Sequence, residues 1–173
     1  SLSLAPPRAT QGPLRGPWGA RPVWGGPALG VVMLVRLMYA SRAVPAVDQE
    51  ELVAILKKSK VNNPKAGITG VLCFSEGIFI QVLEGGRNAV NRLYNRIATD
   101  SRHSDVVLLN YEEIAERRFA GWSMGQVNMA RLNPALLLKY SECAKLDPYA
   151  VSGRVSVALF DELVATAAVM GQG

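Results

Sequence analysis

Residues 68–86 read ITGVLCFSEGIFIQVLEGG, and this stretch decides the fold. Two apolar runs, 68–74 and 78–84, flank the short polar sequence Ser75-Glu76-Gly77. Apolar runs of this length around a glycine-containing turn are typical of a β-hairpin, and the glycine pair that follows breaks the second run. The sequence therefore predicts two adjacent antiparallel strands here.

The segment before the hairpin predicts a strand and a helix. Residues 33–40 form an apolar run suited to a buried strand. Asp48 followed by Glu51 resembles a capping box, and apolar residues recur behind it at helical spacing until Pro64 and Gly67 end the helix. The chain through the hairpin is thus expected to run β-α-β-β.

The segment after the hairpin repeats a helix and strands and then becomes helical. The period of its apolar residues changes from about 3.6 to 2 and back again. The predicted elements are a helix at 87–100, strands at 106–111 and 122–128 joined by a charged connection, and helices at 134–140 and 152–169.

The resulting order, β-α-β-β-α-β-β followed by helices, defines the fold class. Two β-α-β units that share one sheet predict an α+β, ferredoxin-like sandwich with both helices on one face. Residues 129–173 are expected to form a C-terminal helical extension. This fold serves many unrelated functions, so the function has to come from a site.

The net charge of +5 at first suggests a nucleic-acid-binding protein, but its distribution does not. Residues 1–32 hold three arginines, six of the ten prolines and no acidic residue, and without them the net charge is only +2. We interpret 1–32 as a disordered leader that is not native, with Met33 as the natural start. A secretory signal fits less well, because no small-residue cleavage site precedes the first strand.

The remaining composition predicts a cytoplasmic protein. Cys73 and Cys143 have no metal-ligand spacing and are expected to be free thiols in a reducing compartment. His103 is the sole histidine, which leaves little material for a metal site or a Ser-His-Asp triad. No apolar run reaches the roughly 18 residues that a membrane-spanning helix needs.

Two polar side chains are predicted to point into the core. Tyr39 has the parity of its apolar neighbours in the first strand, and Gln81 shares the parity of Phe79 and Leu83. A buried glutamine has to satisfy two donors and an acceptor. The two residues form either a self-satisfying pair or part of a site.

Two further pairs of residues are candidates. Asn62 and Asn63 directly follow the first predicted helix, where amides can present paired donors and acceptors. Trp122 and Met124 lie two apart and are expected on one face of the last strand, where ordinary core packing is the alternative.

Together these features resemble the BLUF family, the flavin-binding blue-light sensor domains, over residues 33–128. Any one of the matching strings is weak, whereas four in the right order are specific. They are LVRLMYASR at 34–42, NNPKAGITG at 62–70, FIQVLEG at 79–85 and RFAGWSMG at 118–125.

The resemblance implies roles for residues around an FAD cofactor. Tyr39 would be the photochemical electron donor, Gln81 would lie between Tyr39 and the flavin, and Asn63 would bind the carbonyl and imide edge of the ring. Ile55 and Ile97 would sandwich the ring. The remaining implied contacts, to the ring, ribityl chain or phosphates, come from Ser59, Asn62, Arg96 and Asp100.

The resemblance also implies a sensor rather than an enzyme. Light would rearrange the hydrogen bonds of Gln81, and the strand with Trp122 and Met124 would pass the change to the C-terminal helices. These helices would signal to a separate downstream protein or hold a homo-oligomer together. A bacterial, cytoplasmic receptor without direct contact to nucleic acid or membrane is expected.

Two rival functions use the same topology. An acylphosphatase-like hydrolase would cradle a phosphate beside Arg42, but residues 41–47 lack a glycine-rich backbone nest. An RNA-binding sheet needs exposed aromatics and a basic face, and Phe74 and Phe79 with a net charge of +2 offer too little.

Overall fold

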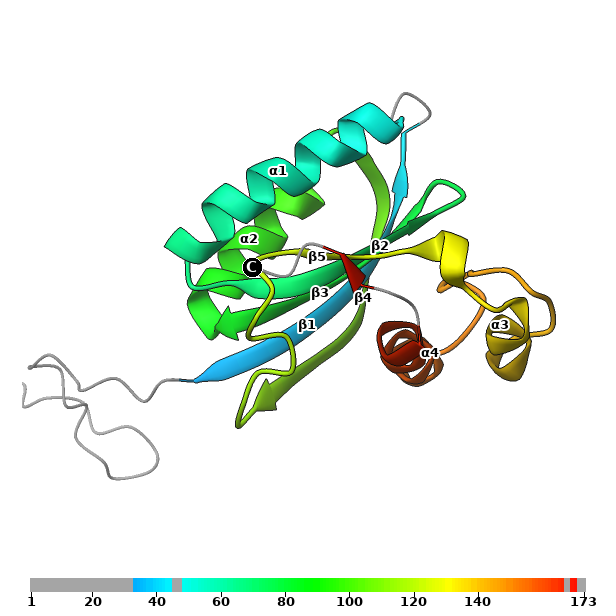
Figure 1. Ribbon diagram of the computed structural model, residues 1–173. Helices are drawn as coiled ribbons and strands as arrows, with labels where there is room; N and C mark the ends of the chain where they lie inside the picture. The colour runs from blue at the N-terminus through cyan, green and yellow to red at the C-terminus, as the bar shows by residue number, and fades with distance from the viewer. Residues whose placement is uncertain (1–32, 45–47, 167–168, 171–173) are drawn as a thin grey trace, which may run out of the picture. The chain divides into compact units, whose positions relative to one another are not determined.

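The computed structural model describes residues 33–44, 48–166 and 169–170. The leader predicted at 1–32 lies outside the described residues. The described chain forms a six-stranded sheet in the order β4-β1-β3-β2-β5-β6 (Figure 1). The strands are β1 (Leu34–Ala43), β2 (Thr69–Ser75), β3 (Ile78–Gly86), β4 (His103–Ile114), β5 (Gly125–Val127) and β6 (Val169–Met170).

The predicted hairpin is present as β2 and β3. Glu76 and Gly77 form its two-residue loop with φ of 50° and 77°. Positive φ at both loop positions matches the right-handed twist of the strands, and glycine adopts it without a steric cost. The hairpin places β3 in the middle of the sheet, antiparallel to both β1 and β2.

Two layers of helices cover the sheet, one on each face. The helices α1 (Gln49–Lys65) and α2 (Arg87–Ala98) lie on one face, and α3 (Pro134–Tyr140) and α4 (Gly153–Thr166) lie on the other (Figure 1). We call these the α1–α2 face and the α3–α4 face. The antiparallel order β4-β1-β3-β2 with two helices on one face confirms the ferredoxin-like prediction.

Each face has its own apolar core. On the α1–α2 face, Leu37, Phe79 and Leu83 pack beneath the buried Leu52 and Leu56 of α1. The other core belongs to the C-terminal helices and the reverse side of the same strands, and its members include Met38, Val71, Cys73, Ile80, Val82, Leu159, Phe160 and Leu163. Alternation along each strand therefore separates the two cores.

The first helix begins at the predicted cap and ends at Lys65, between Pro64 and Gly67 as predicted. The Asp48 carboxylate accepts a hydrogen bond of 2.9 Å from the backbone N–H of Glu51, which caps the helix. Asn62 and Asn63 were expected to follow this helix, and they lie inside its last turns instead. Pro64 lies in the last turn, where its missing N–H removes one intrahelical bond, and the helix ends one residue later.

The predicted last strand at 122–128 is too long. Only Gly125–Val127 joins the ladder, between β2 and β6. The backbone N–H of Trp122 bonds to the carbonyl of Phe119, and the Trp122 carbonyl accepts from Gly70. The first of these bonds closes a turn, so Trp122 lies outside the strand, which begins at Gly125.

Strand β4 and the last helix also differ from their predicted ranges. β4 extends beyond 106–111 because it is an edge strand, where charged side chains are tolerated: Glu112 pairs with Arg36 and Glu113 with Arg87. The last helix was expected to continue to 169 but ends at Thr166, and Val169–Met170 pairs with β5 instead. Within the described ranges, no helix is long and apolar enough to cross a bilayer.

Candidate functional site

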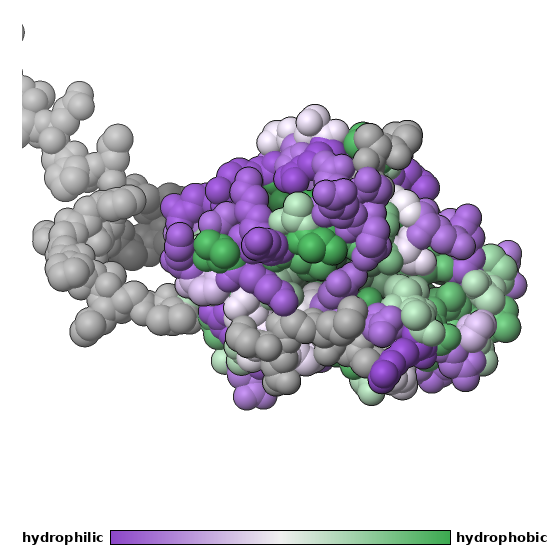
Figure 2. All heavy atoms as spheres, turned by 45° about the horizontal axis from the view of Figure 1, so that its top comes forward, coloured by the Kyte–Doolittle hydropathy of each residue, from purple (hydrophilic) through white to green (hydrophobic). Residues whose placement is uncertain are grey.

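A cavity of about 240 Å³ opens between α1 and α2, above the middle strands of the sheet. Figure 2, with the α1 side turned toward the viewer, shows hydrophobic side chains gathered between hydrophilic ones over this face. All nine residues that the family resemblance associates with cofactor binding line the cavity: Tyr39, Ile55, Ser59, Asn62, Asn63, Gln81, Arg96, Ile97 and Asp100.

The floor of the cavity carries a buried polar pair. Tyr39 on β1 and Gln81 on β3 are directly paired across the strands and are 2% and 6% exposed. The Tyr39 hydroxyl donates a hydrogen bond of 2.5 Å to Oε1 of Gln81. Burial raises the pKa of Tyr39 well above its ordinary value, so the phenol stays protonated.

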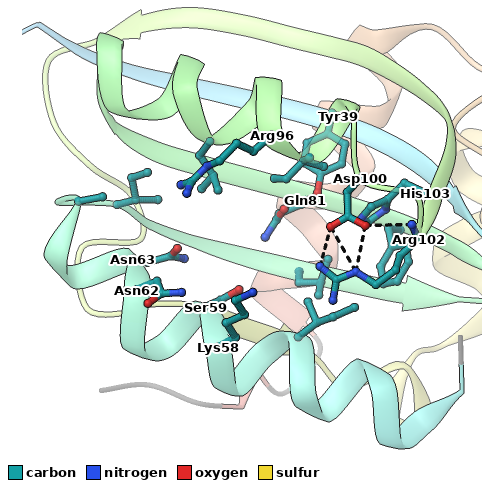
Figure 3. Close-up of a pocket in the computed structure, with 17 residues that line it drawn as sticks. Tyr39, Lys58, Ser59, Asn62, Asn63, Gln81, Arg96, Asp100, Arg102 and His103 are labelled. Atoms are coloured by element: carbon teal, nitrogen blue, oxygen red, sulfur yellow. Dashed lines mark hydrogen bonds and ion pairs between the residues drawn. The ribbon is translucent and has the colours of Figure 1, made fainter.

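The amide of Gln81 has a second partner. Its Nε2 donates to the Met124 sulfur at 3.2 Å, and Met124 is 1% exposed. Gln81 therefore bridges a phenol and a thioether inside the core, with the rest of its donor capacity facing the cavity (Figure 3). A thioether is a weak acceptor, so this second bond is easier to exchange than the first.

Trp122 and Met124 do not share a face, contrary to the prediction. Met124 packs in the core of the α1–α2 face, whereas Trp122 packs against the core of the α3–α4 face. Trp122 is stacked on Phe119, with ring centroids 5.8 Å apart, and its indole N–H has no hydrogen-bond partner among the described residues. The two differ in face because Trp122 belongs to a turn, where strand alternation does not apply.

The two asparagines of α1 differ in their surroundings. Asn63 is buried, and its Nδ2 donates to the backbone carbonyl of Ser123 at 2.9 Å. Asn62 is exposed at the cavity wall beside Ser59 (Figure 3). Asn63 thus joins the wall of the cavity to the segment that leads into Met124.

A charged cluster closes one end of the cavity. The Arg102 guanidinium binds the Asp100 carboxylate through Nε at 3.0 Å and Nη2 at 2.6 Å, and this lowers the pKa of Asp100 to about 2. Nδ1 of His103 lies 2.8 Å from the Ser41 hydroxyl, and burial lowers the pKa of His103. Sequence reasoning had not assigned Arg102 or His103 to the site.

A basic side chain of α1 was also missed. Lys58 lines the cavity one residue before Ser59, opposite Arg96 of α2 (Figure 3). Their positions in the sequence could have indicated all three residues. Lys58 directly precedes Ser59, and Arg102 and His103 closely follow Asp100, both predicted contacts. Within the described part of the chain, no group of three His, Cys, Asp or Glu side chains is placed to hold a metal ion.

The comparison with known families decides the assignment. The model described as "BLUF: Sensors of blue-light using FAD" matches residues 34–125, more than half of the 173-residue chain. The chain belongs to the BLUF family. The resemblance inferred from the sequence is therefore confirmed, and with it the class of function, a flavin-binding blue-light sensor.

Curated relatives of this BLUF domain are parts of longer proteins. The photoactivated adenylate cyclase subunit beta of Euglena longa is 37% identical over 98 residues, which cover 56% of this chain and 11% of that protein. The subunit alpha of Euglena gracilis is 38% identical over 88 residues, covering 51% and 9%. The match thus spans a small part of the length of these relatives.

Solved structures agree over a larger part of the chain. BlsA in its photo-activated state has a TM-score of 0.69 and 31% identity, and the match covers 80% of this chain and 100% of that one. BlrB, a BLUF protein in its dark state, has a TM-score of 0.66 and 34% identity, with 77% and 96% covered. These similarities confirm the α+β sandwich.

The residues of the cavity fit a flavin. Ile55 and Ile97 face it from the two helices and suit the faces of a flat ring. The Gln81 and Asn63 amides supply donors and acceptors for a ring edge, and Lys58 and Arg96 suit an anionic tail.

The rival functions do not fit this BLUF domain. Arg42, the candidate phosphate ligand of a hydrolase, pairs with Asp105 at 3.3 Å and lies over the Tyr149 ring. Phe79, a candidate stacking platform for RNA, is 1% exposed beneath α1. A hydrolase is therefore not supported.

Proposed function

We propose that this chain is a non-enzymatic blue-light photoreceptor that holds FAD in the cavity between α1 and α2 and reports illumination through its C-terminal helices. The observation that carries the proposal is the buried Tyr39–Gln81 pair at the floor of that cavity. Because the pair lines the cavity, its remaining hydrogen-bonding capacity is available to a ligand there.

The proposed roles follow from the chemistry of the two side chains. Bound flavin absorbs blue light and becomes a strong oxidant. Tyr39 would donate an electron and a proton to the flavin, with Gln81, which already accepts a hydrogen bond from Tyr39, relaying the proton. The reverse transfer would restore the Tyr39 phenol and leave Gln81 with changed hydrogen-bond partners, because its bond to the Met124 sulfur is the weaker of its two contacts.

The energy of such an exchange is sufficient for signalling. One hydrogen bond is worth about 1 kcal/mol and up to about 3 kcal/mol with a charged partner. A typical coupling between two sites is about 1–3 kcal/mol. A rearrangement at Gln81 therefore suffices to bias an element that already has two arrangements.

The choice of FAD rests on the description of the family, and the basic rim of the cavity favours a flavin that carries phosphate. Lys58 and Arg96 line it from opposite helices, and both side chains are exposed at its edge. A flavin with a phosphate-containing tail would extend toward these cations, whereas riboflavin would leave them unused. Chromatography of the cofactor released by denaturation distinguishes FAD, FMN and riboflavin. FMN would contradict the choice of FAD, and riboflavin would contradict the role of the basic rim as well.

The output is proposed to leave from the α3–α4 face. β5 follows Met124 directly, and its other edge pairs with β6 at the end of the C-terminal helices. We also propose that the chain forms a homo-oligomer, signals to a separate downstream protein and works in the cytoplasm. Size-exclusion runs in light and in darkness test the homo-oligomer: elution at the volume of a monomer at all concentrations in both conditions would argue against it.

An absorption spectrum tests the central claim. Purified protein should be yellow, blue light should shift the flavin band to the red, and darkness should reverse the shift. Colourless protein that stays colourless after incubation with FAD, or a yellow protein without a reversible shift, would contradict the proposed function.

A further inference from the structure

A buried carboxylate lies beneath the segment that leads to Met124, on the side of the sheet away from the cavity. Glu84 of β3 is 0% exposed. Its Oε1 accepts from Nε of Arg36 at 2.8 Å and from the backbone N–H of Arg118 at 3.2 Å, and its Oε2 accepts from the backbone N–H of Phe119 at 3.1 Å. A fully buried carboxylate is retained only where such partners satisfy it.

Arg117 fixes the chain next to Arg118 by contacts with residues at the start of β2. Its guanidinium donates to Thr69 Oγ1 at 3.0 Å and to the carbonyl of Gly67 at 2.6 Å. Residues 117–119 are thus tied to β2 and β3 by side-chain and backbone contacts that do not involve the cavity. These contacts define the resting position of residues 117–119 relative to the sheet.

Arg118 is held at both ends. Its backbone N–H bonds to Glu84, and its guanidinium pairs with the Asp161 carboxylate of α4. The two side chains of this pair are 47% and 41% exposed. Arg118 therefore connects the middle of the sheet to the C-terminal helix through a single residue.

The same short segment reaches Gln81. The backbone N–H of Trp122 bonds to the Phe119 carbonyl at 3.1 Å, and the Phe119 and Trp122 rings are stacked. Two residues after Trp122, the Met124 sulfur accepts from Gln81. A displacement of Met124 therefore acts on Phe119 and on the backbone bond between Arg118 and Glu84.

We propose that Arg118 couples the Gln81–Met124 contact to α4 through Asp161, with Glu84 as the residue that positions Arg118. The inference rests on the proposed light response and adds its route to the C-terminal helices. The Glu84 carboxylate sets the resting position of the Arg118 backbone. A shift of 119–124 that strains this bond displaces Arg118, and the displacement reaches Asp161 through the guanidinium. Without Glu84, Arg118 has no defined resting position, so the difference that light makes at α4 is lost.

Hydrogen exchange measured by mass spectrometry, together with the absorption shift, tests the coupling. In the wild type, light should raise exchange in peptides from 117–127 and from 153–166. Arg118→Met and Asp161→Asn should keep the red shift and the response of 117–127. They should reduce the response of 153–166 by about two- to five-fold, as expected for an exposed ion pair.

Lys139→Met is the matched control. It removes the pair between Lys139 of α3 and Glu162, the neighbour of Asp161 on α4, and should leave the response of 153–166 intact. The charge exchange Arg118→Asp with Asp161→Arg should restore the response. A full response in Arg118→Met, an equal loss in Lys139→Met, or a wild-type red shift without any response in 153–166 would overturn the coupling.

A dark experiment decides the coupling independently of photochemistry. Glu84→Gln should raise exchange at the amides of Arg118 and Phe119 and also in 153–166. Adding Arg118→Met should abolish only the second effect. If Glu84→Gln raises exchange in 153–166 equally with and without the Arg118 guanidinium, the route is refuted even when the red shift is normal. A missing red shift in the wild type counts against the proposed function alone.

Discussion

The Tyr39 hydroxyl donates a hydrogen bond of 2.5 Å to Oε1 of Gln81, from directly opposed positions of β1 and β3. Both side chains point to the α1–α2 face and lie at the floor of the cavity. Because both are almost fully buried, the bond is shielded from water and any ligand in the cavity meets a preformed pair.

Removing either partner of this pair should abolish the light response without emptying the cavity. Tyr39→Phe removes the electron and proton donor, and Gln81→Leu removes the relay. Both variants should remain yellow and lose the red shift entirely, because the walls of Ile55 and Ile97 are unchanged. Difference absorption spectra measure this, and a normal shift in either variant would show that the roles are assigned wrongly.

Met124 and Trp122 should differ in their effect on dark recovery. Met124→Leu removes the sulfur that accepts a hydrogen bond from Gln81. In this variant the Gln81 amide lacks that weak bond when it returns to its dark position. Such a bond is worth about 0.5–1 kcal/mol, which corresponds to recovery slower by about two- to five-fold.

Trp122→Phe is the control for that prediction. Trp122 packs against the core of the other face. Replacing its indole with the smaller phenyl ring should therefore leave both the size of the red shift and the rate of dark recovery unchanged. Recovery of the flavin band after a light pulse measures both variants. Loss of the shift in Trp122→Phe together with normal recovery in Met124→Leu would reverse the assignment of the two residues.

Adjacent asparagines should contribute unequally to stability. Asn63→Ala deletes the buried bond to the Ser123 carbonyl and should lower the free energy of unfolding by about 1 kcal/mol. Asn62→Ala changes an exposed side chain and should stay within about 0.5 kcal/mol of the wild type. Both positions are in the same helix, so the change in helix propensity affects both variants alike. Equal losses in the free energy of unfolding, measured by urea titration, would contradict the burial of Asn63.

His103 should make the protein less stable in mild acid. Burial lowers its pKa in the folded state, so as the pH falls below about 6.5 the unfolded chain takes up the proton first. The free energy of unfolding contributed by His103 is then fully present above pH 6.5 and decreases toward the folded-state pKa. His103→Gln should show a smaller decrease between pH 7 and 5 than the wild type, and parallel curves would rule this out.

Much of the fold and of the site could be predicted from the sequence. Strand parity placed Tyr39 and Gln81 on one face because alternation is a local property of extended backbone. The hairpin followed from glycine in a short turn between apolar runs, and Asp48 was recognisable as a helix cap from its spacing to Glu51.

The predictions failed where a non-local partner decides the local structure. Trp122 was expected in a strand beside Met124, but hydrogen bonds to Phe119 and Gly70 hold it in a turn and direct it to the opposite face. The last helix was expected to reach 169, but the backbone of Val169–Met170 finds partners on β5. No period in the sequence encodes either contact.

The sequence by itself determined that Tyr39 and Gln81 share a face, where the hairpin turn lies and which family the chain resembles, because these depend on residues close together along the chain. Only the tertiary structure decided that Met124 and not Trp122 contacts Gln81, that Asn63 is buried beside the exposed Asn62, and that Glu84 and Asp161 meet at Arg118. These contacts join residues far apart in the chain. They form because buried polar groups require partners wherever the folded backbone provides them.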